Sequence, residues 1–283
     1  MNTFEYVKMK QQLWAKSKNI ELIGSQINHG EPLYTKELIF NLFQDLSEST
    51  KKEFEDGDGN ELGNGDLPGK MQALHSSSVI GVNFFEYWKQ NQRFEILAKS
   101  LRIPSKGIDY IKFEEKYKIL KDVTMCPNID VNIHYKDSYL VGIECKYTEP
   151  FLSRNTDTGL KKKYLDDFEH WGEFPNLYKL ALKICPEDNT NSYLHTAQLI
   201  KHILGMYSLK KDKNKFRLLY IFYPALFGNN EKYLDEINTL KEVLEKDDIK
   251  FQHLTWQELI LNFTKKTQKE DEGYLNYLIS RYL

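Results

Sequence analysis

Two segments near the middle of the chain alternate apolar and polar residues and are separated by only three residues. They are 129–135 and 139–146, joined by 136–138. Side chains of a strand alternate between its two faces, so the pattern predicts an antiparallel hairpin. A three-residue turn pairs the two apolar sets, whereas a slip by one residue would set apolar against polar. The expected pairs are Ile129 with Cys145, Val131 with Ile143, and Ile133 with Val141.

The same register places two acidic side chains directly opposite each other. Asp130 faces Glu144, and Lys146 follows two residues further along that face. Opposed side chains have Cβ atoms roughly 4.5–5.5 Å apart, and opposed like charges destabilise a sheet by up to about 1 kcal/mol. A shared cation would remove that repulsion. We therefore interpret the three residues as a candidate site that binds a divalent metal and activates water; the alternative is a solvated strand face with a Glu–Lys pair.

The charge balance argues neither for nor against a nucleic-acid partner. The 283 residues, enough for one large or two small domains, carry a net charge of −2, which gives no global attraction to a polyanion. The charge is uneven: residues 53–66 are acidic, while 161–163 and 210–217 are basic. A local basic surface and ordinary solvated loops both remain open.

Cysteine usage and hydropathy favour a reducing, cytoplasmic location. The three cysteines lack CxxC spacing and are expected to be free thiols. No apolar run approaches the roughly 18 residues of a membrane span, and the first residues do not form a signal peptide. Motifs of other chemistries, GxSxG, GxxxxGK and HExxH, are missing from the sequence.

The first third of the chain is expected to be helical with one long loop. Helical periodicity covers about 4–50, including 38–46, and Asp56–Gly69 is a Gly- and Asp-rich loop. That loop begins like a calcium loop but has Glu61 and Leu67 where the pattern needs Gly and Glu, so calcium binding is rejected. Helices are then expected at 71–88 and 94–101, followed by a strand at 110–120.

After the hairpin, the pattern predicts two buried strands and their helices. The predicted elements are short helices and loops at 150–191, a helix at 193–209, strands at 216–226 and 249–256, and a final helix capped by Thr255. This order is typical of an α/β or α+β layered domain, with a mixed central sheet flanked by helices. We expect an N-terminal helical region with its loop at 1–70 and the main domain at 71–283.

The motif on these strands resembles the PD-(D/E)XK nuclease superfamily. The matching residues are Asp130, three positions after Pro127, and Glu144-Cys145-Lys146. The resemblance covers about 71–262. Two stretches, 74–85 and 144–149, are similar to its restriction-endonuclease-like PGN_0703-like group.

This resemblance implies a restriction-endonuclease-like αβββαβ core and a Mg²⁺ site, with Mn²⁺ as a substitute. Mg²⁺ commonly takes one or two carboxylates, waters and phosphate oxygens. Asp130 and Glu144 are then the metal carboxylates, the main-chain carbonyl of Cys145 adds a ligand, and Lys146 orients water or stabilises the charged transition state.

Further residues are auxiliary candidates, each with a surface role as its alternative. Gln198 on the helix after the hairpin corresponds to a glutamine that often contacts the site in the superfamily. A third carboxylate could come from Glu114 or its neighbour Glu115, from Glu149, or from Glu61. His202, one turn beyond Gln198, is expected to pack or hydrogen-bond rather than to catalyse.

The implied activity is Mg²⁺-dependent hydrolysis of double-stranded DNA by a type II restriction or phage-defence endonuclease, as part of restriction-modification. Homodimerisation is an expectation by analogy. Two alternatives remain: a non-catalytic nucleic-acid-binding or assembly protein on the same fold, and a structure-selective repair or junction nuclease.

Overall fold

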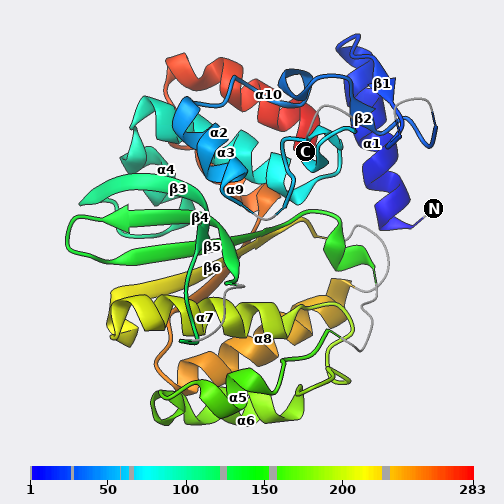
Figure 1. Cartoon of the computed structure of the whole chain (residues 1–283). Helices are drawn as coiled ribbons and strands as arrows, with labels where there is room; N and C mark the ends of the chain where they lie inside the picture. The colour runs from blue at the N-terminus through cyan, green and yellow to red at the C-terminus, as the bar shows by residue number, and fades with distance from the viewer. Residues whose placement is uncertain are drawn as a thin grey trace.

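A mixed β-sheet forms the centre of the molecule. The computed structural model describes residues 2–26, 29–57, 59–63, 67–121, 126–152, 158–224 and 230–283. Within them, five strands lie in the order β3-β4-β5-β6-β7; β3, β4 and β5 are antiparallel, and β6 and β7 continue the sheet in parallel (Figure 1). The strands are β3 Ile108–Lys116, β4 Asn128–Tyr135, β5 Leu140–Lys146, β6 Phe216–Phe222 and β7 Phe251–Thr255.

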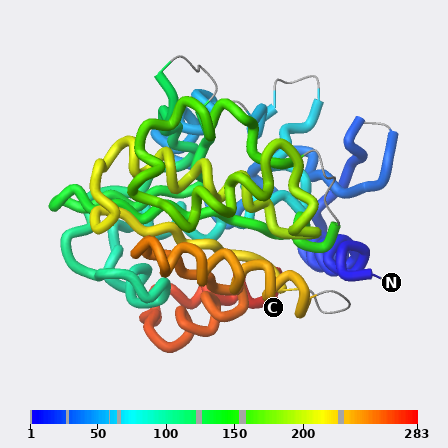
Figure 2. Tube along the Cα trace, turned by 90° about the horizontal axis from the view of Figure 1, so that it is seen from below, coloured from blue at the N-terminus to red at the C-terminus, as the bar shows by residue number. Residues whose placement is uncertain are grey.

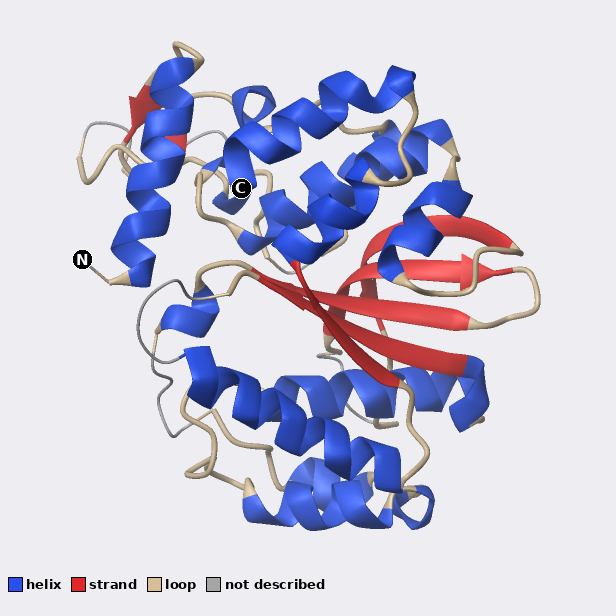
Figure 3. Ribbon diagram, turned by 180° about the vertical axis from the view of Figure 1, so that it is seen from behind, coloured by secondary structure: helices blue, strands red, loops and turns tan. Residues whose placement is uncertain are grey.

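Helices cover both faces of this sheet, so the predicted mixed α/β layering is confirmed (Figure 3). Each face has its own hydrophobic cluster: on β6, Leu219 and Ile221 enter one cluster, and Leu218 and Tyr220 the other. Burial on both faces explains the continuous apolar run of this strand. One layer contains α3 Ser77–Asn91, α4 Phe94–Leu101, α9 Trp256–Thr264 and α10 Glu272–Tyr282. The other contains α5 Lys163–Asp167, α6 Pro175–Lys183, α7 Thr196–Lys210 and α8 Asn230–Lys246.

The N-terminal segment packs onto the first of these layers. Its elements are α1 Thr3–Ser17, β1 Leu22–Ile23, β2 Tyr34–Thr35 and α2 Glu48–Glu55, with α1 at one side of the molecule (Figure 2). The expected α-helix at 38–46 is wrong, because only a 3₁₀ turn forms there, at Leu38–Asn41. The backbone N–H of Phe43 donates to the side chain of Asn83 on α3 (2.8 Å), so a tertiary contact replaces the helical hydrogen bond.

The hairpin of β4 and β5 has the predicted register and turn. Val131 pairs with Ile143, and Ile133 with Val141. Its three-residue turn ends at Ser138, whose positive φ of 63° is the left-handed conformation that such turns require.

At the end nearest the candidate site, the strand alternation changes. The β4–β5 ladder stops at Val131–Ile143, and Ile129 packs in the cluster opposite to that of Cys145. The expected Ile129–Cys145 pair is therefore wrong. On the neighbouring strand Glu114 has φ 51°, a distortion that accompanies this change of face.

A helix that the sequence order missed joins the last two strands. Parallel strands need a crossover, and α8 supplies it between β6 and β7. Its buried residues Tyr233, Ile237, Leu240 and Leu244 recur with helical spacing, which was the available signal.

The helical pattern expected over 4–50 is also wrong between α1 and α2, where the described residues include the short strands β1 and β2; the elements predicted after residue 70 agree with the structure to within several residues. Thr255 caps α9 through a reciprocal capping box with Glu258, as expected. In the predicted loop 56–69, the described residues form no helix or strand, and Asp58 and 64–66 lie outside the described residues, as do 225 and 226 of the predicted strand 216–226. In the described part of the chain, no helix combines the length and apolar character needed to cross a membrane.

Candidate active site

Asp130, Glu144 and Lys146 lie at one edge of the sheet. Asp130 stands near the start of β4, and the other two stand at the end of β5. The carboxylate Oδ2 of Asp130 accepts the backbone N–H of Cys145 at 2.7 Å. The β4–β5 ladder ends at the pair Val131–Ile143, so the N–H of Cys145 has no partner in the ladder. The Asp130 carboxylate accepts this N–H in place of a backbone carbonyl of β4. The expected direct pairing of Asp130 with Glu144 is therefore not part of the ladder; instead Asp130 bonds to the backbone of Cys145, between Glu144 and Lys146.

Glu144 is enclosed by two cationic or hydrogen-bonding partners. Its side chain is 0% exposed; Oε1 lies 2.6 Å from Nζ of Lys146, and Oε2 lies 2.8 Å from Nε2 of His202. Burial pushes the pKa of Glu144 upward, but Lys146 and His202 outweigh it and bring the pKa to about 2. Burial acts in the opposite direction on Lys146, whose pKa is nevertheless raised by Glu144, Glu149 and Asp130.

The carboxyl groups of Asp130 and Glu114 both have raised pKa values. The pKa of Asp130 is raised well above its usual range by burial and by the charges of Glu144 and Glu114. The pKa of Glu114 is raised to about 7, mainly by burial, although Asn128 donates to its Oε2 at 3.1 Å. Converging carboxyl groups with raised pKa values are typical of functional sites.

Glu61 and Glu149 border this group from the other side. Both line a pocket together with Ser76, Ser77 and Ser78 at the start of α3. Burial raises the pKa of Glu61, and the charge of Glu149 raises it further. Glu149 accepts the backbone N–H of Tyr147 at 2.9 Å. The structure thus brings three of the auxiliary carboxylates, Glu61, Glu114 and Glu149, to the neighbourhood of Asp130 and Glu144.

Glu115 and Gln198 are not joined to this group. Glu115 turns toward His134, at 2.7 Å. Within the described residues, no hydrogen bond connects the side chain of Gln198 to the site. Instead His202, one helical turn further along the same face of α7, reaches Glu144. The expected packing and hydrogen bonding of His202 is confirmed, but its partner Glu144 was not predicted; the one-turn spacing from Gln198 was the signal that could have found it.

The donor set fits a hard divalent cation. Mg²⁺ prefers oxygen ligands and needs only one or two carboxylates, since water and substrate fill the remaining positions. Among the described residues, no three His, Cys, Asp or Glu side chains are arranged so that they could hold a metal ion on their own, so any cation here would depend on water or substrate for the rest of its ligands. A strand residue points its N–H and C=O toward the same neighbour, so the carbonyl of Cys145 lies on the side where its N–H meets Asp130.

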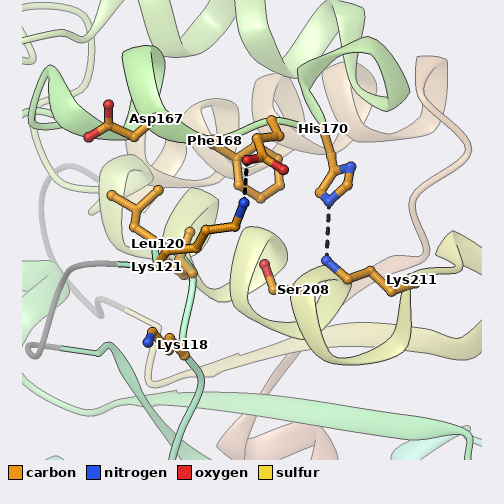
Figure 4. Close-up of a pocket in the computed structure, with 10 residues that line it drawn as sticks. Lys118, Leu120, Lys121, Asp167, Phe168, His170, Ser208 and Lys211 are labelled. Atoms are coloured by element: carbon orange, nitrogen blue, oxygen red, sulfur yellow. Dashed lines mark hydrogen bonds and ion pairs between the residues drawn. The ribbon is translucent and has the colours of Figure 1, made fainter.

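A separate pocket shares no residue with this site (Figure 4). It lies between 118–121, 167–170 and the end of α7. Two of its lysines are already engaged: Lys121 with Glu169 at 2.7 Å, and Lys211 with His170 at 3.1 Å.

A family comparison matches almost the whole chain. The family described as restriction endonuclease associating with ARP matches residues 8–283. The chain belongs to this family. Membership in the ARP-associating restriction endonuclease family indicates a nuclease role and a restriction-endonuclease-like character. No match to the chain was found among curated proteins or among solved structures.

Proposed function

We propose that this chain is a Mg²⁺-dependent endodeoxyribonuclease of the PD-(D/E)XK type that hydrolyses phosphodiester bonds of double-stranded DNA. One observation carries the proposal: Asp130 bonds to the backbone between Glu144 and Lys146, and Nζ of Lys146 lies 2.6 Å from Oε1 of Glu144. An αβββαβ core fits the order of α3, β3, β4, β5, α7 and β6.

Asp130, Glu144 and the carbonyl of Cys145 would hold the metal. When bound, Mg²⁺, or Mn²⁺ in its place, lowers the pKa of water and neutralises charge on the phosphate. Of these two carboxylates, Asp130 is partly exposed whereas Glu144 is fully buried, so solvent reaches Asp130 more directly.

Lys146 and His202 set the state of Glu144. The raised pKa of Lys146 keeps its ammonium protonated, and with its side chain 15% exposed it can reach both Glu144 and an incoming phosphate oxygen. His202 fixes the other carboxylate oxygen from α7. With a pKa of about 7, Glu114 can hold or release a proton near neutral pH. Glu61 and Glu149 add two further acidic side chains in the adjoining pocket.

The family membership supports a proposal for the biological setting. We infer a type II restriction or phage-defence role in the cytoplasm, within restriction-modification. The family description adds association with ARP, which we carry over to this chain as a proposed partner alongside DNA. A homodimer would cut both strands.

One observation favours a second candidate, a non-catalytic DNA-binding or assembly protein. Both oxygens of Glu144 already have partners in a fully buried position. A structure-selective repair nuclease would use the same site. Only the choice of DNA substrate distinguishes such an enzyme from a restriction endonuclease.

Incubation of the purified protein with plasmid and phage DNA tests the proposal. Nicking or cutting in Mg²⁺ and none in EDTA is the expected result; discrete bands indicate sequence-specific restriction, and a smear indicates a nonspecific nuclease. DNA binding without cleavage in Mg²⁺ or Mn²⁺ would favour the second candidate.

A further inference from the structure

A pocket lies just beyond the end of β5, beside the candidate active site. Its volume is about 380 Å³, which is within the range of small-ligand sites. Glu149, one of its lining residues, follows Lys146 by three positions. Three residues span at most about 11 Å, so the pocket is close to the side chains that would hold the metal and the reacting phosphate. We call it the α3 pocket, because the first residues of α3 line it.

Two aromatic side chains line the α3 pocket and are held in place by backbone contacts. They are Tyr34 on β2 and His75 just before α3, with ring centroids 6.5 Å apart and an interplanar angle of 83°. The N–H of Leu74 donates to the carbonyl of Leu33 at 2.8 Å, which ties the two segments together. Oγ1 of Thr148 donates to the carbonyl of His75 at 3.4 Å and links both segments to the end of β5. The two rings are therefore a fixed part of the wall.

The wall also contains hydrogen-bonding groups that the fold leaves without partners. Within the part of the chain that the structure describes, Nδ1 of His75 and Oε2 of Glu61 are buried and make no hydrogen bond. Buried polar groups without partners are rare and cost free energy. Ser77 and Ser78 add two hydroxyl groups to the same wall. A ligand that carries both donors and acceptors matches this combination.

The charge of the α3 pocket disfavours an anion. Among its described lining residues, the carboxylates of Glu61 and Glu149 stand against one ammonium group, that of Lys70. That ammonium lies 3.9 Å from Oε1 of Glu61. Burial lowers the pKa of His75, so its imidazole is neutral near pH 7. A phosphate group therefore fits poorly, whereas a flat, neutral molecule with N–H groups fits the rings and the carboxylates.

A nucleobase is such a molecule. We propose that the α3 pocket receives an unstacked base of the DNA, on the nucleotide beside the phosphate that is cleaved. Tyr34 and His75 pack against the base, and the carboxylate of Glu61 accepts an N–H from its edge. Enzymes that extrude a base hold it between aromatic side chains and groups that read its hydrogen-bonding edge. This inference rests on the proposed function and adds the part of the substrate that the pocket selects.

The carboxylate gives the pocket a preference among bases. An acidic side chain accepts the amino group of cytosine, whereas thymine presents an oxygen acceptor at the same position. Glu61 is therefore expected to favour a base that carries an amino group over thymine.

The test compares fluorescein-labelled duplexes that differ at one unpaired nucleotide, which carries cytosine, thymine or no base. An unpaired base leaves the stack at little cost, so the comparison isolates the pocket. Binding is measured by fluorescence anisotropy in EDTA, so that the DNA stays intact. The wild type is expected to bind the cytosine duplex about tenfold more tightly than the abasic duplex and about fivefold more tightly than the thymine duplex.

Three variants assign these preferences to residues. Tyr34→Ala combined with His75→Ala should bind the cytosine and abasic duplexes almost equally, because the stacking partners are lost. Glu61→Leu should lose the preference for cytosine over thymine. Tyr110→Ala is the matched control, since Tyr110 is an exposed aromatic residue of β3 that does not line the α3 pocket; it should keep both preferences. Circular dichroism and thermal unfolding establish that each variant is folded.

A wild-type protein that binds all three duplexes equally would overturn the base site while leaving the nuclease proposal intact, and this comparison needs no variant. A folded double variant that keeps the wild-type preference for a base would overturn it too, as would equal losses in the double variant and in Tyr110→Ala. A wild-type protein that neither binds nor cuts DNA would overturn the proposed function itself and this inference with it.

Discussion

The Nε2 atom of His202 lies 2.8 Å from Oε2 of Glu144, and both side chains are fully buried. A helix in the layer below the sheet thereby fixes the orientation of a carboxylate on a central strand. The other oxygen of Glu144, Oε1, lies 2.6 Å from Nζ of Lys146. This contact gives His202 a positioning role.

Two replacements of His202 test whether its hydrogen bond to Glu144, and not only its packing, stabilises the protein. His202→Leu leaves a buried carboxylate oxygen without a donor and should lower the free energy of unfolding by about 1–3 kcal/mol. His202→Gln keeps a donor and should retain most of the stability. Chemical denaturation measures both, and equal stability of the two variants would contradict the role.

Asp130→Asn tests whether charge repulsion between Asp130 and the carboxylates of Glu144 and Glu114 destabilises the protein. The amide oxygen still accepts the N–H of Cys145, while one charge beside Glu144 and Glu114 is removed. In EDTA at pH 8, the unfolding free energy should exceed that of the wild type by about 1–2 kcal/mol. Mg²⁺ should raise the melting temperature of the wild type but not of the variant.

Asp109→Asn, at an exposed position of β3, is the control for Asp130→Asn. It should change neither the stability nor the response to Mg²⁺. An Asp130→Asn protein that is stabilised by Mg²⁺ as strongly as the wild type would exclude Asp130 as a ligand.

The raised pKa of Glu114 predicts that the stability of the protein depends on pH. Its pKa is about 7 in the folded protein and near its ordinary 4.5 when unfolded, so the folded state binds more protons between these values. Stability from this group is therefore lost as pH rises from about 4.5 to about 7. In EDTA, Glu114→Gln should unfold at a higher temperature than the wild type at pH 8, with a smaller difference at pH 5.

Glu55→Gln is the control, because Glu55 is exposed on α2. Its melting temperature should follow the wild type at both pH values. A difference between Glu114→Gln and the wild type that does not change with pH would refute the raised pKa.

Lys146 is expected to serve both the fold and the reaction. Lys146→Met leaves Glu144 buried with only His202 and should lower the free energy of unfolding by about 3–5 kcal/mol. Lys146→Arg keeps the charge, so it should fold, but its planar guanidinium cannot replace a compact ammonium. Cleavage by the folded Lys146→Arg protein should fall by about 10²-fold; wild-type cleavage would remove Lys146 from the mechanism.

The sequence predicted the hairpin because two independent patterns select one register. Apolar alternation and the three-residue turn both pair Val131 with Ile143, and the structure has this pair. The pattern could not predict where the ladder stops, since that depends on the side chain of Asp130 bonding to Cys145. For the same reason the face of Ile129 was assigned incorrectly.

Tertiary contacts explain the other differences. Residues 38–46 have helical periodicity, but Asn83 on α3 takes the N–H of Phe43 that a helix would use. The approach of His202 to Glu144 joins residues 58 positions apart. Local patterns carry no information on such pairings, although the helical spacing in α7 and α8 marks which residues face inward.

Cleavage of plasmid DNA in Mg²⁺ by the wild type, Asp130→Asn, Glu144→Gln and Asp109→Asn shows whether Asp130 and Glu144 form the active site. We expect the wild type and Asp109→Asn to cut, EDTA to stop both, and the other two folded variants to lose at least about 10²-fold in rate. Full cleavage by folded Asp130→Asn or Glu144→Gln would contradict the assignment of the site.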